Sequence, residues 1–244
     1  MNDSIQTVVL ILRSGGVYGF RDVELLSFHL QKQWHGSKKL RILCLFDKVD
    51  ETRKLINVTL MPMQNKEWPG WWSKMNMFSP DMEQYRPFLY IDLDMAIVGS
   101  LEGILPPPGR ENQFITLEGF NGRAKYLLSG MMWLPAKNDM ISKVWEQWIE
   151  DPDLGMQQCR GDQNFIQNVV GEPDERWQNI TDKICNFKPR NGVAVKGSNW
   201  CQRIIEAVPD SASVVCLHGK PKIFDAAEKI NWVKKYINNV YDKR

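Results

Sequence analysis

Two carboxylates, Asp92 and Asp94, stand two residues apart where an apolar run over 88–91 should end as a buried strand. In an extended chain, residues i and i+2 project to the same face, so we expect the two side chains to point together. Adjacent like charges on an apolar strand are costly unless a cation joins them. A hard divalent ion, Mn²⁺ or Mg²⁺, meets that need, and the alternative interpretation is two solvated aspartates at an exposed strand end.

Other polar side chains follow apolar runs elsewhere in the chain. Arg13 follows the run over 7–12, and His218, Gly219 and Lys220 follow the run over 214–217. Imidazole suits Mn²⁺ better than Mg²⁺, so His218 is a candidate third metal ligand beside the two aspartates. The Lys220 side chain and the Gly219 amide are candidates for binding phosphate oxygens.

The elements that must position these residues alternate between strand and helix patterns. Apolar runs at 7–12, 40–46 and 58–61 predict three strands before the aspartate pair, and apolar residues at helical spacing over 23–34 predict a helix between the first two. Doubly wound folds place ligands at the carboxyl ends of their strands. We therefore predict an α/β fold, a single Rossmann-like domain over 1–244 with a mostly parallel central sheet flanked by helices.

Later segments extend this pattern. Strands are expected at 113–116, 126–134 and 214–217, and helical faces near 141–148, 162–169 and 230–241, the last helix with Asp225 as its N-cap. The segment 67–78 carries Trp68, Trp71 and Trp72, which we expect to cap the sheet. Lys74 lies in the same segment, and packing explains a charged lysine less well than it explains the tryptophans.

Composition excludes several classes of function. The 244 residues carry a formal net charge of +2, from 31 basic and 29 acidic residues, which gives no reason to expect a nucleic-acid partner. The five cysteines include no Cys-x-x-Cys pair, which argues against a disulfide framework and a zinc site. No signal peptide or membrane span is expected, so we place the protein in the cytoplasm. Peripheral membrane contact through Lys234 and Lys235 is disfavoured by nearby acidic residues.

Taken in order, these motifs resemble the GT-A-fold glycosyltransferases that use nucleotide sugars, in particular the glycogenin and lipopolysaccharide galactosyltransferase type, family 8. The matching pieces span most of the chain: Lys74, 89–94 with 99–101, 129–132, 161–163 and 218–221. The resemblance implies a GT-A domain with Mn²⁺ or Mg²⁺, a nucleoside-diphosphate sugar as donor and a saccharide-type acceptor. It further implies a hexosyltransferase that retains the anomeric configuration.

The resemblance also implies a role for each matching residue. Asp92, Asp94 and His218 hold the metal, and Asp162 lies beside the transferred sugar as the candidate catalytic group. Tyr18 lies where an aromatic residue often meets the nucleobase. Together with strand-end Arg13, the positions expected to bind the donor are Arg13, Tyr18, Lys74, Asp92, Asp94, Ser129, Gly130, Gly219 and Lys220.

The sequence departs from the family's pattern at four places. Leu128 replaces an asparagine, Asn164 replaces a second acid, the 218–221 motif is more compact, and Lys222 replaces an aromatic residue. These departures leave the donor sugar and the stereochemistry open.

Two other functions remain as alternatives. A phosphatase of the haloacid dehalogenase type has a similar Asp-x-Asp motif, but that motif normally opens the domain, whereas here three strand candidates precede it. The second alternative is a nucleotide-sugar-binding module without turnover, which donor hydrolysis would distinguish from an enzyme.

Overall fold

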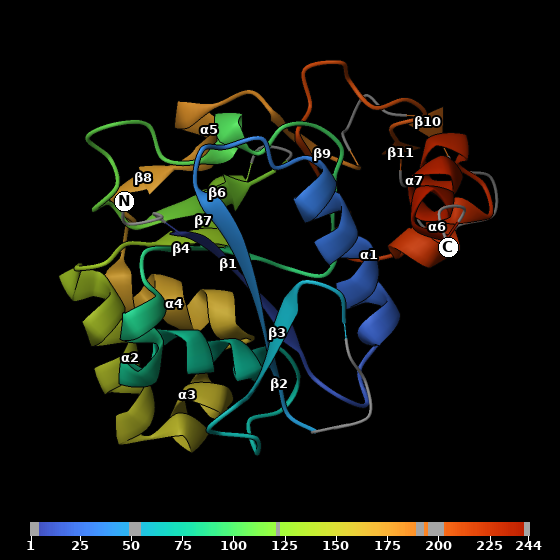
Figure 1. Ribbon diagram of the computed structural model, residues 1–244. Helices are drawn as coiled ribbons and strands as arrows, with labels where there is room; N and C mark the ends of the chain where they lie inside the picture. The colour runs from blue at the N-terminus through green and yellow to red at the C-terminus, as the bar shows by residue number, and fades with distance from the viewer. Residues whose placement is uncertain (1–4, 49–54, 121–122, 189–192, 195–202, 242–244) are drawn as a thin grey trace.

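The computed structural model describes residues 5–48, 55–120, 123–188, 193–194 and 203–241 (Figure 1). Cys201, one of the five cysteines, and Asp242, one of the acidic residues near Lys234 and Lys235, lie outside the described residues. None of the described helices combines the length and apolar character needed to cross a bilayer.

A mixed central sheet organises the fold. Within the described part of the chain its seven strands lie in the order β3-β2-β1-β4-β7-β6-β8. Their bounds are β1 Ile5–Leu12, β2 Lys39–Phe46, β3 Val58–Pro62, β4 Phe88–Ile91, β6 Ile115–Gly119, β7 Arg123–Leu134 and β8 Glu175–Arg176. Strand β1 runs parallel to β2 and β4, β2 to β3, and β6 to β8, whereas β7 is antiparallel to both β4 and β6. The mostly parallel sheet and the strands expected before Asp92 are confirmed.

Alternation along β1 shows how the two faces of this sheet are covered. Val8, Leu10 and Leu12 belong to one buried cluster with the apolar face of α1, whereas Val9 and Ile11 belong to another. The second cluster includes side chains of three helical elements, η1 (Gly70–Phe78), α2 (Asp139–Glu150) and α4 (Asp162–Val170). Figure 1 shows α1 (Phe20–Lys32) on the opposite side of the sheet from α2 and α4. Both faces are buried, as the continuous apolar run of β1 indicates.

A second, smaller sheet corrects one expectation. The apolar run at 214–217 forms β12 (Val214–Cys216), which pairs not with the central sheet but with β5 (Met95–Ile97) and β9 (Ile184–Asn186). It is antiparallel to β5 and parallel to β9. The strand at β12 was expected, but β5 and β9 have only three residues each and are too short to show a period in the sequence, so the pairing of β12 could not be predicted.

The C-terminal segment also differs from the single helix expected there. It forms α6 (Ile223–Ala227) and α7 (Asn231–Tyr241), and the N-cap of α6 is Lys222. The prediction that Asp225 is an N-cap is wrong, because Asp225 lies inside α6 and its carboxylate accepts a hydrogen bond from the Lys222 amide at 3.3 Å. The remaining elements are η2 Pro80–Tyr85, η3 Glu102–Ile104, α3 Pro152–Gln158, α5 Trp177–Ile180, β10 Val193–Ala194 and β11 Arg203–Ile204.

The tryptophans near η1 are divided between core and surface. Trp68 and Trp72 are buried, and both rings pack against Trp148 of α2, with centroids 5.2 and 5.0 Å away. Trp71, in contrast, is 56% exposed. The expectation that these tryptophans cap the sheet is therefore confirmed for Trp68 and Trp72 and wrong for Trp71.

Candidate active site

Asp92 and Asp94 lie where the chain passes from one sheet to the other. Strand β4 ends at Ile91 and β5 begins at Met95, and the Met95 amide donates to the Asp92 carbonyl at 3.2 Å. The two carboxylates therefore lie on a turn, whereas the sequence predicted that they lie on extended chain. The turn arises because β5 belongs to the small sheet, so the chain must change direction after β4.

A large cleft opens at this crossing. It has a volume of about 1810 Å³ and receives residues from the ends of β1 and β4, from η1, from β7 and from the start of α4. Ten of the predicted site residues line it: Arg13, Tyr18, Lys74, Asp92, Asp94, Ser129, Gly130, Asp162, His218 and Gly219. Residues from distant parts of the sequence thus meet in one cavity large enough for a nucleotide sugar.

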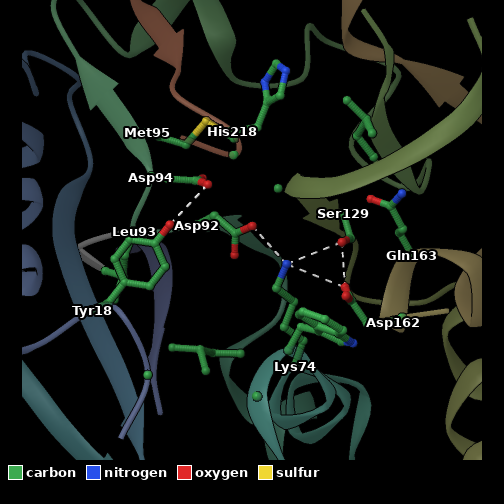
Figure 2. Close-up of a pocket in the computed structure, with 18 of the residues that line it drawn as sticks. Tyr18, Lys74, Asp92, Leu93, Asp94, Met95, Ser129, Asp162, Gln163 and His218 are labelled. Atoms are coloured by element: carbon green, nitrogen blue, oxygen red, sulfur yellow. Dashed lines mark hydrogen bonds and ion pairs between the residues drawn. The ribbon is translucent and has the colours of Figure 1, made fainter. Parts of the chain in front are cut away.

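Lys74 joins two of the candidate carboxylates. Its Nζ donates to Asp92 Oδ2 at 2.8 Å and to Ser129 Oγ at 3.3 Å, and it lies 3.5 Å from Asp162 Oδ2 (Figure 2). Ser129 Oγ donates to Asp162 Oδ2 at 2.5 Å. Asp162 is the first residue of α4, whose N-cap is Gly161, so its carboxylate is directed to Lys74 and Ser129 rather than serving as the cap.

Burial and charge act in opposite directions on these groups. Burial would lower the pKa of Lys74, but Asp162 and Asp92 raise it above its ordinary value, so the ammonium stays charged. Burial raises the pKa of Asp92 to about 6, against the lowering effect of Lys74. The Tyr90 hydroxyl also donates to Asp92 Oδ1. A shifted carboxyl group with a specific cation in a cleft is typical of a functional site.

Asp94 has a separate set of partners on the other side of the turn. Tyr18 and Lys222 both donate to its Oδ2 oxygen at 3.2 Å, and Lys222 Nζ lies 4.8 Å from the centre of the Tyr18 ring. Burial raises the pKa of Tyr18, and Asp94 adds to that shift, so its hydroxyl stays protonated. Each aspartate of the pair is therefore neutralised by its own lysine.

Lys220 is placed differently from expectation. It is exposed and is not among the residues that line the cleft, whereas Lys222 and Lys188 do line it. Burial, with Lys222 nearby, lowers the pKa of Lys188 to about 8, and its Nζ donates to the His218 carbonyl oxygen. Gly219 lines the cleft with φ of +72°, a conformation that favours glycine.

Sequence reasoning did not assign Lys188 or Lys222 to the site. The only signal for Lys222 was that it stands where the resembled family has an aromatic residue. Lys188 gave no signal, because its place depends on how β9 pairs with β12.

Two further predicted residues have structural partners. Arg13 and Ser14, at the end of β1, both bind the carboxylate of Asp47 at the end of β2, with the Ser14 amide at 2.8 Å. Arg13 therefore supports one wall of the cleft by joining two strand ends. Gly130 leaves room for the aspartate turn, because a Cβ there would lie 2.7 Å from Met95 Cε and 3.5 Å from Asp92 Oδ2.

The predicted metal ligands are only partly brought together. His218 lies at the cleft, but its ring stacks on Phe120 at 5.8 Å, and Figure 2 shows it turned away from Asp94. Among the described residues, no three His, Cys, Asp or Glu side chains are placed to share one ion. Two carboxylates with phosphate oxygens from a substrate nevertheless suit Mg²⁺ or Mn²⁺, so Asp92 and Asp94 fit such an ion. His218 would have to turn to join them, and its role as a ligand stays a prediction.

Comparison with known proteins shows which solved structures share this fold. No protein-family model matches the sequence, and no curated protein matches it. Among solved structures, the galactosyltransferase LgtC with donor and acceptor sugar analogues superposes with a TM-score of 0.62 at 13% identity, covering 96% of both chains. An active-site mutant of LgtC gives 0.64 at 11% identity, covering 98% of this chain and 96% of that one. The glycosyltransferase GlyE of Streptococcus pneumoniae TIGR4 gives 0.61 at 14% identity, covering 98% of this chain and 64% of that one.

The chain therefore has the GT-A fold of these glycosyltransferases over nearly its full length. This agrees with the resemblance drawn from the sequence motifs. The structure also disfavours the phosphatase alternative, because Asp92 follows β4, the fourth strand along the chain, and not the first.

Proposed function

We propose that this protein is a glycosyltransferase that moves a sugar from a nucleoside-diphosphate donor to a saccharide-type acceptor. The observation that carries the proposal is the row of charged groups along the cleft, from Lys222 and Asp94 through Asp92 and Lys74 to Asp162. The GT-A fold raises the weight of this interpretation by analogy.

The leaving group in this reaction is a nucleoside diphosphate, which gains negative charge as the glycosyl bond breaks. Lys222 and Lys188 line the cleft beside Gly219 and are suited to stabilise that charge where it develops. Tyr18, which holds Asp94 on the same side, marks the wall proposed for the nucleobase.

A divalent ion would be held by Asp92 and Asp94, with His218 as the proposed third ligand. When bound, such an ion supplies positive charge to the departing diphosphate. Lys222 would then exchange its contact with Asp94 for one with the phosphates, because an ammonium and a metal ion compete for the same carboxylate oxygen.

Asp162 is proposed to face the transferred sugar. The sugar carbon becomes oxocarbenium-like as the bond breaks, and a nearby carboxylate stabilises that charge. Lys74 and Ser129 fix the position of this carboxylate. From the family resemblance we further propose a hexose as the transferred sugar and retention of configuration. The cytoplasmic location expected from the sequence is likewise a proposal.

A screen of nucleotide sugars tests this proposal. We expect at least one donor to raise the melting temperature of the protein and to be hydrolysed in the presence of Mn²⁺. Asp94→Ala should abolish hydrolysis while leaving the fold nearly intact, since a carboxylate on a turn adds little to the core. Full activity with EDTA present would exclude the metal, and donor binding without any turnover would favour the binding-module alternative.

A further inference from the structure

One aromatic side chain of η1, that of Trp71, lines the cleft, while the other aromatic residues of η1, Trp72 and Phe78, are buried. In a 3₁₀-helix residues three apart lie on the same face, so Trp71 shares the face of Lys74. Both residues line the cleft, whereas Trp72 and Met75, the next pair at the same spacing, are buried on the core side. The element that carries Lys74 to the carboxylates therefore also presents an exposed indole one turn away.

Trp71 lies at the Asp162 end of the charged row. A Cβ at Gly161 would lie 3.1 Å from Trp71 Nε1, so the indole covers the residue directly before Asp162. Tyr18 lies at the other end of the row, against Asp94. With the nucleobase proposed at the Tyr18 wall, Trp71 occupies the side from which an acceptor would approach Asp162.

A second exposed aromatic residue lines the cleft from β7. Tyr126 is 42% exposed and lies on the strand face that also carries Leu128 and Gly130 into the cleft, at the alternating positions of a strand. Exposed large aromatic side chains that line a cavity mark a binding surface more often than scattered apolar residues do. Trp71 and Tyr126 are both of this kind.

Polar side chains of this cleft set the class of ligand. Arg160, Gln163 and Asn164 line it from the residues on either side of Gly161 and Asp162. An aromatic face beside amide and guanidinium groups suits a ligand with one apolar face and many hydroxyl groups, which describes a pyranose ring. An acyl chain would leave these polar groups unpaired.

We propose that Trp71 and Tyr126 form the acceptor subsite and stack against the pyranose ring of a saccharide acceptor. This inference rests on the proposed glycosyltransferase function and deepens it by assigning the acceptor side of the cleft. It concerns binding alone and involves no chemical step.

The test is a binding measurement by saturation-transfer NMR with lactose, maltose and cellobiose as probes, in the presence of a nucleoside diphosphate. We expect at least one disaccharide to bind the wild-type protein. Trp71→Ala should raise the dissociation constant of that disaccharide roughly tenfold, the loss typical of truncating a central aromatic contact. Tyr126→Ala should weaken it as well, and Trp71→Phe should retain part of the affinity because a ring remains. Leu154→Ala is the matched control, since Leu154 is 45% exposed on α3 and should bind as the wild type does.

The outcomes separate this inference from the proposed function. Equal affinity in wild type and Trp71→Ala, or no binding of any disaccharide, overturns the acceptor subsite even if the protein hydrolyses a nucleotide sugar. Saccharide binding that depends on Trp71, without hydrolysis of any donor, would support the saccharide-binding site and contradict the proposed glycosyltransferase activity. Sedimentation with phosphatidylcholine–phosphatidylglycerol vesicles that depends on Trp71, without saccharide binding, would assign the two aromatic residues to a lipid surface instead.

Discussion

At the level of single residues, the cleft is defined by two lysines, each of which pairs with a different member of the Asp92–Asp94 pair. Lys74, with 11% of its side chain exposed, holds Asp92 within a buried network that also includes Asp162. Lys222 is more accessible, with 24% of its side chain exposed, and holds Asp94. Lys74 is therefore suited to keep the carboxylates in place, whereas Lys222 is free enough to exchange partners when an anion arrives.

This difference predicts which lysine binds the donor. Lys222→Ala should weaken the affinity for a nucleoside diphosphate by about 1.5–3 kcal/mol, because it removes a charge-assisted contact and leaves Asp94 to repel the phosphates. Lys220→Ala should have a smaller effect, because Lys220 is exposed outside the cleft. Calorimetric titration of both variants makes the comparison, and a larger loss in Lys220→Ala would restore the assignment drawn from the sequence motif.

At the level of elements, the site depends on the passage from β4 to β5. Periodicity and the order of strands were enough to predict the central sheet and the position of Asp92 and Asp94 at its edge. They could not show that the chain turns between these residues, because that turn exists only to begin a three-residue strand of another sheet. For the same reason Lys222 was missed, since its direction is set by the chain after β12.

The tryptophan segment gives the same lesson for side chains. Composition alone could not tell Trp71 from Trp72, because both are large and apolar. The distinction depends on the 3₁₀ geometry of η1, which places them on different faces.

The close contact between Gly99, which follows β5, and the backbone of Ala212 can be tested by substitution at Gly99. The Val98 and Gly99 amides both donate to the Ser213 carbonyl, and a Cβ at Gly99 would lie 2.6 Å from the Ala212 carbonyl oxygen. Because that oxygen belongs to the backbone, Gly99→Ala should force the two segments apart and destabilise the protein by about 1–3 kcal/mol. The melting temperature should fall by roughly 2–4 °C for each kcal/mol.

Gly16→Ala is the control for this prediction. A Cβ at Gly16 would lie 3.5 Å from the Arg13 carbonyl oxygen, an ordinary contact, so its melting temperature should change little. Equal melting temperatures for the two variants would contradict this prediction, because they would show that the backbone near Gly99 can move to accommodate a Cβ at little cost in stability.

At the level of the whole molecule, a buried histidine joins α1 to α7. His29 is 2% exposed, and its ring stacks on Tyr236 with centroids 3.6 Å apart. His29 Nε2 lies 2.9 Å from the Tyr236 carbonyl oxygen, so it carries the proton and donates, while the Tyr236 hydroxyl accepts from the Ile97 amide at 3.1 Å. The C-terminal helix is thereby connected to both α1 and the strand that follows the aspartate turn.

This arrangement predicts how stability depends on pH. Burial lowers the pKa of His29 from 6.5 to about 4, and Lys32 adds to the shift. The unfolded chain therefore binds a proton that the folded protein excludes, so the stabilisation is complete above about pH 6.5 and is lost as the pH falls towards 4. The contribution of His29 to this loss is about 3 kcal/mol at most.

Urea denaturation across this range isolates the effect. His29→Gln lacks the titrating group but keeps a donor, so its stability should fall less between pH 6.5 and 4 than that of the wild type. His35→Gln, at an exposed position, should follow the wild-type curve. Parallel curves for all three proteins would contradict the buried neutral histidine.

The clearest test of a glycosyltransferase cleft is the rate at which wild type and Asp162→Asn release nucleoside diphosphate from UDP-, GDP-, ADP- and CDP-linked sugars. The substitution keeps the shape of the side chain and removes its charge, and Gly161 rather than Asp162 caps α4, so the helix should be unaffected. We expect wild-type protein to release diphosphate from at least one donor. Asp162→Asn should release it orders of magnitude more slowly, with diphosphate affinity nearly unchanged. Its melting temperature should fall to some extent, because buried Lys74 loses one of its two carboxylate partners. Equal rates in the two proteins, or no release from any donor, would contradict the assignment.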